Sequence, residues 1–329
     1  MEIIRDLDRI GDYPNPVVTI GNFDGVHRGH QKIFSRVVTE AKSIGGTPIA
    51  ITFEPHPVRV LYPERGQKLI TTYRDKMGLI ALMGIKVLIC IPFSREFART
   101  EPDDFIRNVL VDRLHVRWVI VGHSYAFGRG KKGSTALLRR RGRKYGFKVS
   151  VVRYAKTDST IVSSSRVRSL LLRGRVCEAS RMLGRLYHIG GVVVHGAGRG
   201  AKILHTPTAN ISMENELIPK EGVYAVRVSL PGNDVKERTL MRGSVSGGVF
   251  DGVMNIGCNP TFGDGPVTCE VHIFDANSDF VGRELRVHFI ERIRDEKKFP
   301  GPAELMDQIA ADIGDARTIH SRRDDVLYL

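Results

Sequence analysis

The stretch Gly21-Asn22-Phe23-Asp24-Gly25-Val26-His27-Arg28-Gly29-His30 joins a short apolar run, residues 17–20, to a segment with helical spacing. Glycines at such a junction let the backbone approach a phosphate closely. A helix N-terminus there offers free N–H groups and the positive end of a dipole. The two histidines are about one helical turn apart, so their imidazoles can face the same phosphate oxygens. The stretch therefore predicts a phosphate cradle between a strand and a helix.

Short apolar runs alternate with helical segments on both sides of this cradle. Strands are expected at residues 17–20, 47–53, 87–92, 116–121 and 147–153. Helices are expected at residues 30–44, 72–83, 102–114 and 134–143. Such alternation predicts a parallel sheet with helices on both faces, and ligands of such sheets bind at the carboxyl ends of the strands.

The pattern changes after residue 186. Residues 164–185 predict two short helices, and β-rich runs punctuated by Gly and Pro follow at 189–195, 222–230, 248–257, 267–273 and 284–292. This spacing is typical of an antiparallel barrel or sandwich. Residues 302–319 have the apolar spacing of an amphipathic helix. We therefore expect two domains, residues 1–186 and 187–329.

The composition excludes several classes of protein. The length of 329 residues fits about two domains of roughly 150 residues, and 42% hydrophobic with 26% charged residues excludes a disordered or collagen-like chain. No apolar run approaches the roughly 20 residues of a membrane span, and the first residues do not resemble a secretory signal. The four cysteines form no CxxC pair, so neither structural zinc nor a disulfide framework is expected. A reduced, cytoplasmic setting fits this usage.

The net charge is +14, and residues 129–185 alone carry 17 basic and 2 acidic residues. This excess indicates either a solvated basic face or a surface for polyanions such as nucleic acid. Only Tyr145, Phe147 and Tyr154 interrupt the basic residues with aromatic rings. Nucleic-acid binding is therefore the less favoured interpretation, although it stays open.

The cradle resembles the HxGH signature of the nucleotidyltransferase superfamily. With Phe23-Asp24-Gly25 attached, it is similar to the bifunctional riboflavin kinase/FMN adenylyltransferases, and the resemblance extends from about residue 15 to residue 318. It implies a Rossmann-like nucleotidyltransferase domain followed by an antiparallel β-barrel kinase domain with a terminal helix. It implies that riboflavin, FMN and ATP are the substrates and Mg²⁺ the cofactor, and that FMN and FAD are the products. It also implies catalytic roles for His27 and His30, and ATP-phosphate contacts for Gly21, Phe23, Asp24, Gly25 and Gly29.

Three further segments of the first half resemble family motifs. Thr52-Phe53-Glu54-Pro55-His56-Pro57 resembles TF(D/E)PHP, which implies a flavin contact for His56. Residues 162–168 resemble ISSTxIR, so Ser164, Ser165 and Arg168 are expected to hold phosphates. The loop at residues 121–130 implies flavin contacts for Ser124 and Phe127. It departs from the family at Ser124, usually Asp or Asn, and at Ala126, often Arg.

The second half resembles riboflavin kinases. In Pro207-Thr208-Ala209-Asn210, the hydroxyl of Thr208 and the amide oxygen of Asn210 are hard ligands suited to Mg²⁺. Strand alternation separates Glu270 from the apolar face of residues 267–273, and a carboxylate there can accept the proton of an attacking alcohol. The resemblance adds a nucleotide flap that includes Gly198 and Gly200, and flavin contacts for Arg292 and Arg294.

Alternatives remain at this stage. His205 and Thr206 stand where the family usually has a glycine and an aromatic residue, so the kinase half can be weaker than the adenylyltransferase. The first half alone also fits a nucleotidyltransferase for another phosphate substrate. An RNA-binding protein that uses the basic stretch is the third alternative.

Overall fold

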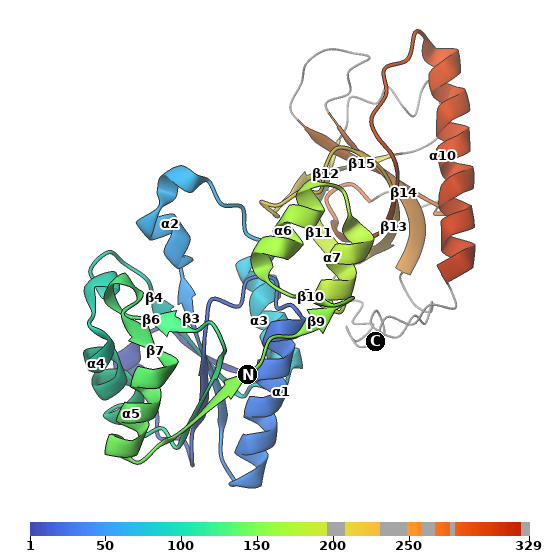
Figure 1. Cartoon of the computed structure of the whole chain (residues 1–329). Coiled ribbons are helices and arrows are strands. Elements are labelled where there is room, and N and C mark those ends of the chain that lie inside the picture. The colour runs from blue at the N-terminus through green and yellow to red at the C-terminus, as the bar shows by residue number, and fades with distance from the viewer. Residues whose placement is uncertain (196–207, 231–248, 258–266, 277–279, 324–329) are drawn as a thin grey trace. The chain divides into compact units, whose positions relative to one another are not determined.

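The computed structural model describes residues 1–195, 208–230, 249–257, 267–276 and 280–323. The chain divides into two compact units, Met1–Ser163 and Ser164–Leu329, each with its own sheet (Figure 1). Each unit is considered by itself.

The first unit is built on a six-stranded sheet in the order β1-β4-β3-β2-β5-β8. All of its neighbouring strands are parallel. The strands are β1 (Glu2–Ile4), β2 (Val17–Ile20), β3 (Pro48–Glu54), β4 (Val87–Pro92), β5 (Trp118–Gly122) and β8 (Lys148–Val152). The helices are α1 (Arg28–Ser43), α2 (Pro57–Leu61), α3 (Tyr73–Leu82), α4 (Pro102–Phe105), which a π-helical segment (Ile106–Val111) continues, and α5 (Thr135–Tyr145). The chain proceeds outward from β2 in both directions, so the strand order reverses between β2 and β5.

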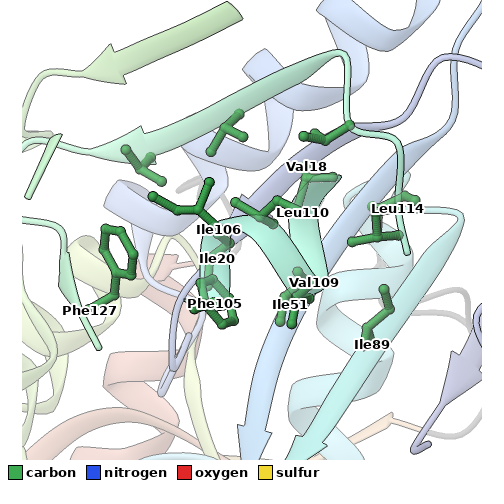
Figure 2. Close-up of a cluster of buried hydrophobic side chains, with 14 of the residues drawn as sticks. Val18, Ile20, Ile51, Ile89, Phe105, Ile106, Val109, Leu110, Leu114 and Phe127 are labelled. Carbon is green, nitrogen blue, oxygen red and sulfur yellow. The ribbon is translucent and has the colours of Figure 1, made fainter. Parts of the chain in front are cut away.

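The four central strands of this sheet, β2 to β5, are buried on both faces. Val17 and Val18 belong to different clusters because successive side chains point to opposite faces. One cluster combines Val18 with side chains of α4 and the segment that continues it (Figure 2). The other combines Val17 with Phe34 of α1 and Ile80 of α3. Cover on both faces explains why these strands are continuous apolar runs rather than alternating ones.

The second unit contains a closed antiparallel barrel in the order β11-β12-β15-β14-β13-β16. Its strands are β11 (Tyr187–Val194), β12 (Ala209–Met213), β13 (Gly222–Ser229), β14 (Val249–Gly257), β15 (Thr268–Ile273) and β16 (Glu284–Arg294). Its helices are α6 (Ser164–Leu172), α7 (Val176–Leu183) and α10 (Pro302–Arg323). The predicted combination of a Rossmann-like domain and a β-barrel with a terminal helix is confirmed, and the sequence did not predict the strands β1 and β12.

The short helices α6 and α7 group with the barrel. The Cys177 thiol of α7 lies 3.1 Å from the Ile290 carbonyl oxygen of β16, and the Ser180 hydroxyl accepts from the Tyr187 N–H at 3.2 Å. The Lys220 N–H, just before β13, donates to the Leu171 carbonyl of α6. The compact units divide at residue 163, before both helices. The domain boundary at residue 186, which the sequence places after both helices, stays a prediction.

The long helix α10 is fixed to the barrel by an apolar seam and an ion pair. Ala316 of α10 is fully buried against Val223, Ala225 and Ile290 of the barrel. Beside this seam, Arg294 makes two hydrogen bonds of 2.7 Å to the carboxylate of Asp312, which is only 4% exposed. A buried carboxylate in this position depends on its partner, because removing one member leaves the other charge unpaired.

We expect Asp312→Ala to destabilise the second unit by about 3–5 kcal/mol, since it leaves the Arg294 guanidinium without its carboxylate. Hydrogen–deuterium exchange across α10 and β16, combined with urea unfolding, measures this loss. Asp315→Ala, at an exposed position of the same helix, should change stability by less than about 0.5 kcal/mol. Equal effects of the two substitutions would contradict the structural role of the pair.

Candidate functional site

The cradle lies where the strand order reverses, at the carboxyl end of β2. Parallel sheets bind ligands in the crevice at this point. The turn between β2 and α1 contains two non-glycine residues with left-handed backbone, Phe23 (φ 53°) and Val26 (φ 40°). Such conformations cost of order 1–3 kcal/mol each and persist where the surroundings enforce them. Gly21 is needed here because a Cβ would lie 2.9 Å from the Phe23 ring.

Asp24 holds the turn in place. Its side chain is 5% exposed, and Oδ1 accepts hydrogen bonds from the backbone N–H groups of Ile70 and Thr71, at 2.9 and 3.4 Å. The Thr71 hydroxyl in turn accepts from the Gly25 N–H at 3.2 Å. The structure therefore shows Asp24 and Gly25 tying the cradle to the segment before α3. Their predicted contact with ATP phosphates stays a prediction.

His27 and His30 are brought together as the sequence predicted. His27 is the N-cap of α1, and its Nδ1 accepts from the His30 N–H at 3.3 Å. The two rings stack with centroids 3.7 Å apart and planes at 16°, while the Phe23 ring meets His30 edge-on at 5.3 Å. Because Nδ1 of His27 accepts a hydrogen bond, its ring proton resides on Nε2. Gly29 permits this packing, since a Cβ would lie 2.9 Å from the His27 ring.

This arrangement is suited to stabilising negative charge at phosphorus. The N-terminus of α1 supplies backbone N–H groups and the positive end of the helix dipole. The two imidazoles are held at that end in a fixed orientation, so they can donate to oxygens whose charge develops during a displacement without first reorganising.

The predicted flavin contacts of the first unit have different surroundings. His56 is buried and caps α2, because its Nδ1 accepts from the Val58 N–H at 3.2 Å. Phe127 is part of the core and packs against Phe105 at 5.8 Å. Ser124 is exposed in the loop that follows β5. Of the three, Ser124 is therefore the most accessible to a ligand, and all three roles stay predictions.

Two polar features near these residues were missed by sequence reasoning. Burial raises the pKa of Tyr125, whose ring stacks on Phe127 at 5.3 Å. The ammonium of Lys76, a buried residue in the first turn of α3, lies 3.5 Å from the Glu54 carboxylate at the end of β3. The partner of Lys76 is 22 residues away in sequence, so this pairing has no sequence signal.

Ser164, Ser165 and Arg168 lie in the first five residues of α6. Ser164 and Arg168 are four residues apart, so they share one side of the helix. Both are partly exposed, and Ser165 is exposed. They begin the second unit, and their predicted role beside His27 and His30 stays a prediction.

The barrel aligns a row of polar residues across three strands. Asn210 of β12 lies directly opposite Glu270 of β15, and Glu270 lies opposite Asn255 of β14. The neighbours Cys269 and Val271 are buried, as the predicted strand alternation requires. Burial raises the pKa of Glu270 above the ordinary value of 4.5. Asn255 had not been singled out, because no motif marks it and only the strand register reveals its place.

The donors near Glu270 fit Mg²⁺ chemically. Thr208, which is exposed just before β12, supplies a hydroxyl, and Asn210 supplies an amide oxygen. Within the described ranges, no cluster of three His, Cys, Asp or Glu side chains could hold a metal by itself. A site with few protein ligands suits Mg²⁺, which keeps several waters and takes substrate phosphates as ligands.

Arg292 and Arg294 both have structural partners. The Arg292 guanidinium donates to the Tyr224 hydroxyl, the Glu221 carbonyl and the Asp295 carboxylate. Hydrogen bonds from Arg292 and Lys220 lower the pKa of Asp295 to about 2. Arg294 is the partner of Asp312 on α10. Flavin contacts by these arginines stay predictions. Gly198, Gly200, His205 and Thr206 lie outside the described residues.

The two units match two family models. The FAD synthetase model matches residues 11–166, and the riboflavin kinase model matches residues 183–320. A bifunctional riboflavin kinase/FMN adenylyltransferase of Buchnera aphidicola is 33% identical over 316 residues, which cover 95% of this chain and 96% of the relative. The enzyme of the same name from Escherichia coli K12 is 33% identical over 314 residues, with the same two coverages.

A solved structure from Streptococcus pneumoniae, named there as a macrolide-efflux protein, is also similar. It superposes with a TM-score of 0.83 at 29% identity and covers 96% of this chain and 98% of its own. Among the described residues of the present chain, no helix has the length and apolar character to cross a membrane.

We expect Asp24→Ala to destabilise the first unit by about 2–3 kcal/mol, because it leaves the N–H groups of Ile70 and Thr71 buried without their acceptor. Asp24→Asn keeps an oxygen at that position and should recover at least half of the loss. Urea unfolding followed by the fluorescence of Trp118, the single tryptophan of the chain, measures both. If Ala and Asn had equal effects, the acceptor oxygen would not be the reason for the buried carboxylate.

Proposed function

The chain belongs to the family of bifunctional riboflavin kinases/FMN adenylyltransferases, and from this membership we propose how its residues divide the two reactions. The enzyme phosphorylates riboflavin to FMN with ATP, and it then adenylylates FMN to FAD with release of pyrophosphate. The observation that carries the division is the presence of one polar site in each unit. The stacked histidines lie at the start of α1, and the row around Glu270 lies on the barrel.

Adenylyl transfer is assigned to the part of the chain that the FAD synthetase model matches. A phosphate oxygen of FMN attacks the α-phosphorus of ATP, and the bond from that phosphorus to the bridging oxygen breaks, so that pyrophosphate leaves. The attacking oxygen is already an anion, so the step needs no general base. His27, through Nε2–H, and His30 stabilise the charge on the phosphoryl oxygens. Ser164, Ser165 and Arg168 hold the leaving pyrophosphate.

Phosphorylation of riboflavin is assigned to the barrel. The primary hydroxyl of riboflavin attacks the γ-phosphorus of ATP, its proton passes to the Glu270 carboxylate, and ADP leaves. Thr208 and Asn210 would hold Mg²⁺, which when bound neutralises phosphate charge. Asn255 lies beside Glu270 in the strand register and can orient its carboxylate by hydrogen bonding. Positioning and charge neutralisation are the main demands of phosphoryl transfer.

Flavin binding in the first unit is assigned to Ser124, with His56 and Phe127 shaping the loops around it. His56 caps α2 through Nδ1, which accepts from the Val58 N–H. Serine is shorter than the usual Asp or Asn of the family, so we expect a lower affinity for FMN at this position. In the second unit, Arg292 and Arg294 contribute mainly by holding β16 in place.

We expect His30→Ala to reduce FAD formation from FMN by at least about 100-fold, the usual loss when a preorganised donor to the transition state is removed, with FMN formation unchanged. Glu270→Gln should do the reverse, stopping FMN formation while FAD still forms from supplied FMN. Chromatographic time courses with riboflavin or FMN, ATP and Mg²⁺ measure both steps, and each variant controls for the other. Loss of both steps in a folded single variant would overturn the two-site assignment.

The pH dependence of the kinase step tests the role of Glu270. Burial raises its pKa above 4.5, and only the ionised form accepts a proton. The acid limb of kcat/KM for riboflavin phosphorylation should therefore fall at a pH above that of an ordinary glutamate. This limb should be absent from FAD formation with supplied FMN. A kinase profile without an acid limb above pH 4.5 would contradict the assignment of Glu270 as the base.

A further inference from the structure

Two exposed aromatic rings meet at the carboxyl edge of the sheet of the first unit. His123 directly follows β5, and Tyr154 lies two residues after β8. Their ring centroids are 4.9 Å apart and their planes lie at 41°. Both side chains are exposed, Tyr154 by 43%, and neither belongs to the two core clusters of this unit. We call these two residues the aromatic pair. Core packing does not account for it.

The pairing of β5 with β8 brings the two rings together. Gly122, the last residue of β5, lies opposite Val152, the last residue of β8. A turn then holds His123 at the edge, because the Tyr125 N–H donates to the Gly122 carbonyl at 3.1 Å. The strands are parallel, so both chain segments leave the sheet at the edge where ligands of such sheets bind.

On the β5 side, the aromatic pair adjoins the strand and the helix that form the cradle. β5 is the neighbour of β2 in the sheet, and neighbouring strands lie about 4.8 Å apart. A Cβ built on Gly122, the residue before His123, would lie 3.4 Å from Ile33 of α1. The edge at His123 is therefore continuous with the edge at which the stacked histidines lie.

On the β8 side, the segment after Tyr154 returns to the cradle. The Val162 N–H donates to the carbonyl of Ala155, the residue after Tyr154, at 3.0 Å. The Val162 carbonyl oxygen lies 3.9 Å from the point that a Cβ on Gly29 would occupy. Gly29 immediately precedes His30 in the sequence. A ligand whose phosphate lies at the stacked histidines therefore has the aromatic pair within reach of its ring.

The side chains around the aromatic pair favour a planar ligand that carries negative charge. Arg153 and Lys156, on either side of Tyr154 in the sequence, are exposed. An apolar protein surface would not match two rings flanked by cations, whereas a nucleotide offers both a planar base and phosphates. Aromatic side chains stack on the faces of bases, and rings inclined at 41° can present a face and an edge to the same base.

Both substrates of adenylyl transfer, ATP and FMN, carry a planar ring, and the order of the chain favours ATP. Two residues after Val162 the chain reaches Ser164, the first of the residues assigned to the leaving pyrophosphate. In an in-line displacement, the attacking FMN oxygen lies on the opposite side of the phosphorus from this leaving group. The segment from Tyr154 to Ser164 therefore faces the ATP side of the reacting phosphorus. We propose that the aromatic pair binds the adenine ring of ATP, an inference that rests on the proposed adenylyl transfer at the cradle.

The test measures FAD formation from supplied FMN by the full chain. His123→Ala and Tyr154→Ala should each raise the KM for ATP by about 5–150-fold, the range that stacking of one base contributes. The kcat and the KM for FMN should stay unchanged, because a contact made equally in the ground state and the transition state alters the KM of its own substrate alone. Tyr154→Phe keeps the ring and should keep the KM of the unaltered chain. Riboflavin phosphorylation should be unchanged in all three variants.

Inorganic tripolyphosphate serves as a probe that has the phosphates of ATP without its ring. It should inhibit FAD formation with the same inhibition constant in the unaltered chain and in both alanine variants, because the contact that they lose is with the ring.

A matched control removes two rings from the opposite edge of the same strands. His115 and Tyr145 lie three positions before β5 and β8. The control combines Tyr145→Ala with His115→Asn, since asparagine tolerates the left-handed backbone at position 115 (φ 46°). Its KM for ATP should be that of the unaltered chain, and a rise equal to that of the alanine variants would overturn the proposal.

An unchanged KM for ATP in both alanine variants, in a chain that forms FAD, would overturn the inference and leave the proposed function intact. A rise in the KM for FMN alone would assign the aromatic pair to the isoalloxazine ring and overturn the assignment to adenine. Weaker inhibition by tripolyphosphate in the alanine variants would show a general distortion of the cradle and would also overturn the inference. Absence of FAD formation by the unaltered chain would overturn the proposed function, and the inference with it.

Discussion

The hydrogen bond from the His30 N–H to Nδ1 of His27 is the interaction on which the proposed adenylyl-transfer site depends. It starts α1, so it fixes where the helix dipole begins, and it determines which nitrogen of His27 carries the proton. The turn that precedes it holds Phe23 and Val26 in left-handed conformations. That turn is held in place by Asp24, whose carboxylate accepts hydrogen bonds from the backbone N–H groups of Ile70 and Thr71. The orientation of His27 and His30 therefore depends in part on the buried carboxylate of Asp24.

The sequence predicted five of the six strands in the sheet of the first unit and missed β1. The central strands β2 to β5 are buried on both faces and therefore appear as uninterrupted apolar runs. In the second unit the sequence missed β12, whose residues Ala209-Asn210-Ile211-Ser212-Met213 have little strand character of their own. This strand exists because β11 and β15 on either side supply its hydrogen-bond partners. The sequence also predicted one helix from residue 102 to 114, where a short α-helix passes into a π-helical segment. Hydrophobic spacing reports which residues face the core, and it does not distinguish between helix types.

The candidate sites were predictable to different degrees. His27 and His30 meet as expected because their spacing on a helix already brings them together, and Glu270 faces away from the barrel core because strand alternation requires it. The contacts of the arginines were harder to predict, since a long guanidinium side chain can reach many partners. Arg292 and Arg294 lie on β16 as predicted, yet their hydrogen bonds go to Tyr224, Glu221, Asp295 and Asp312. The position of Asn255 opposite Glu270 could not be predicted from the sequence, because it depends on the register in which β14 and β15 pair.

The two units differ in how their sheets end, and this difference bears on the association of separate copies of the chain. The barrel closes on itself, so its strands offer no unpaired edge to another molecule. The sheet of the first unit is open and ends at β1 and β8. β1 has only three residues, and β8 begins with the exposed Lys148. Short length and a lysine are two devices that discourage edge-to-edge pairing. Protection against edge-to-edge pairing therefore comes from closure of the barrel in the second unit. In the first unit it depends on the short length of β1 and on the charge of Lys148 in β8.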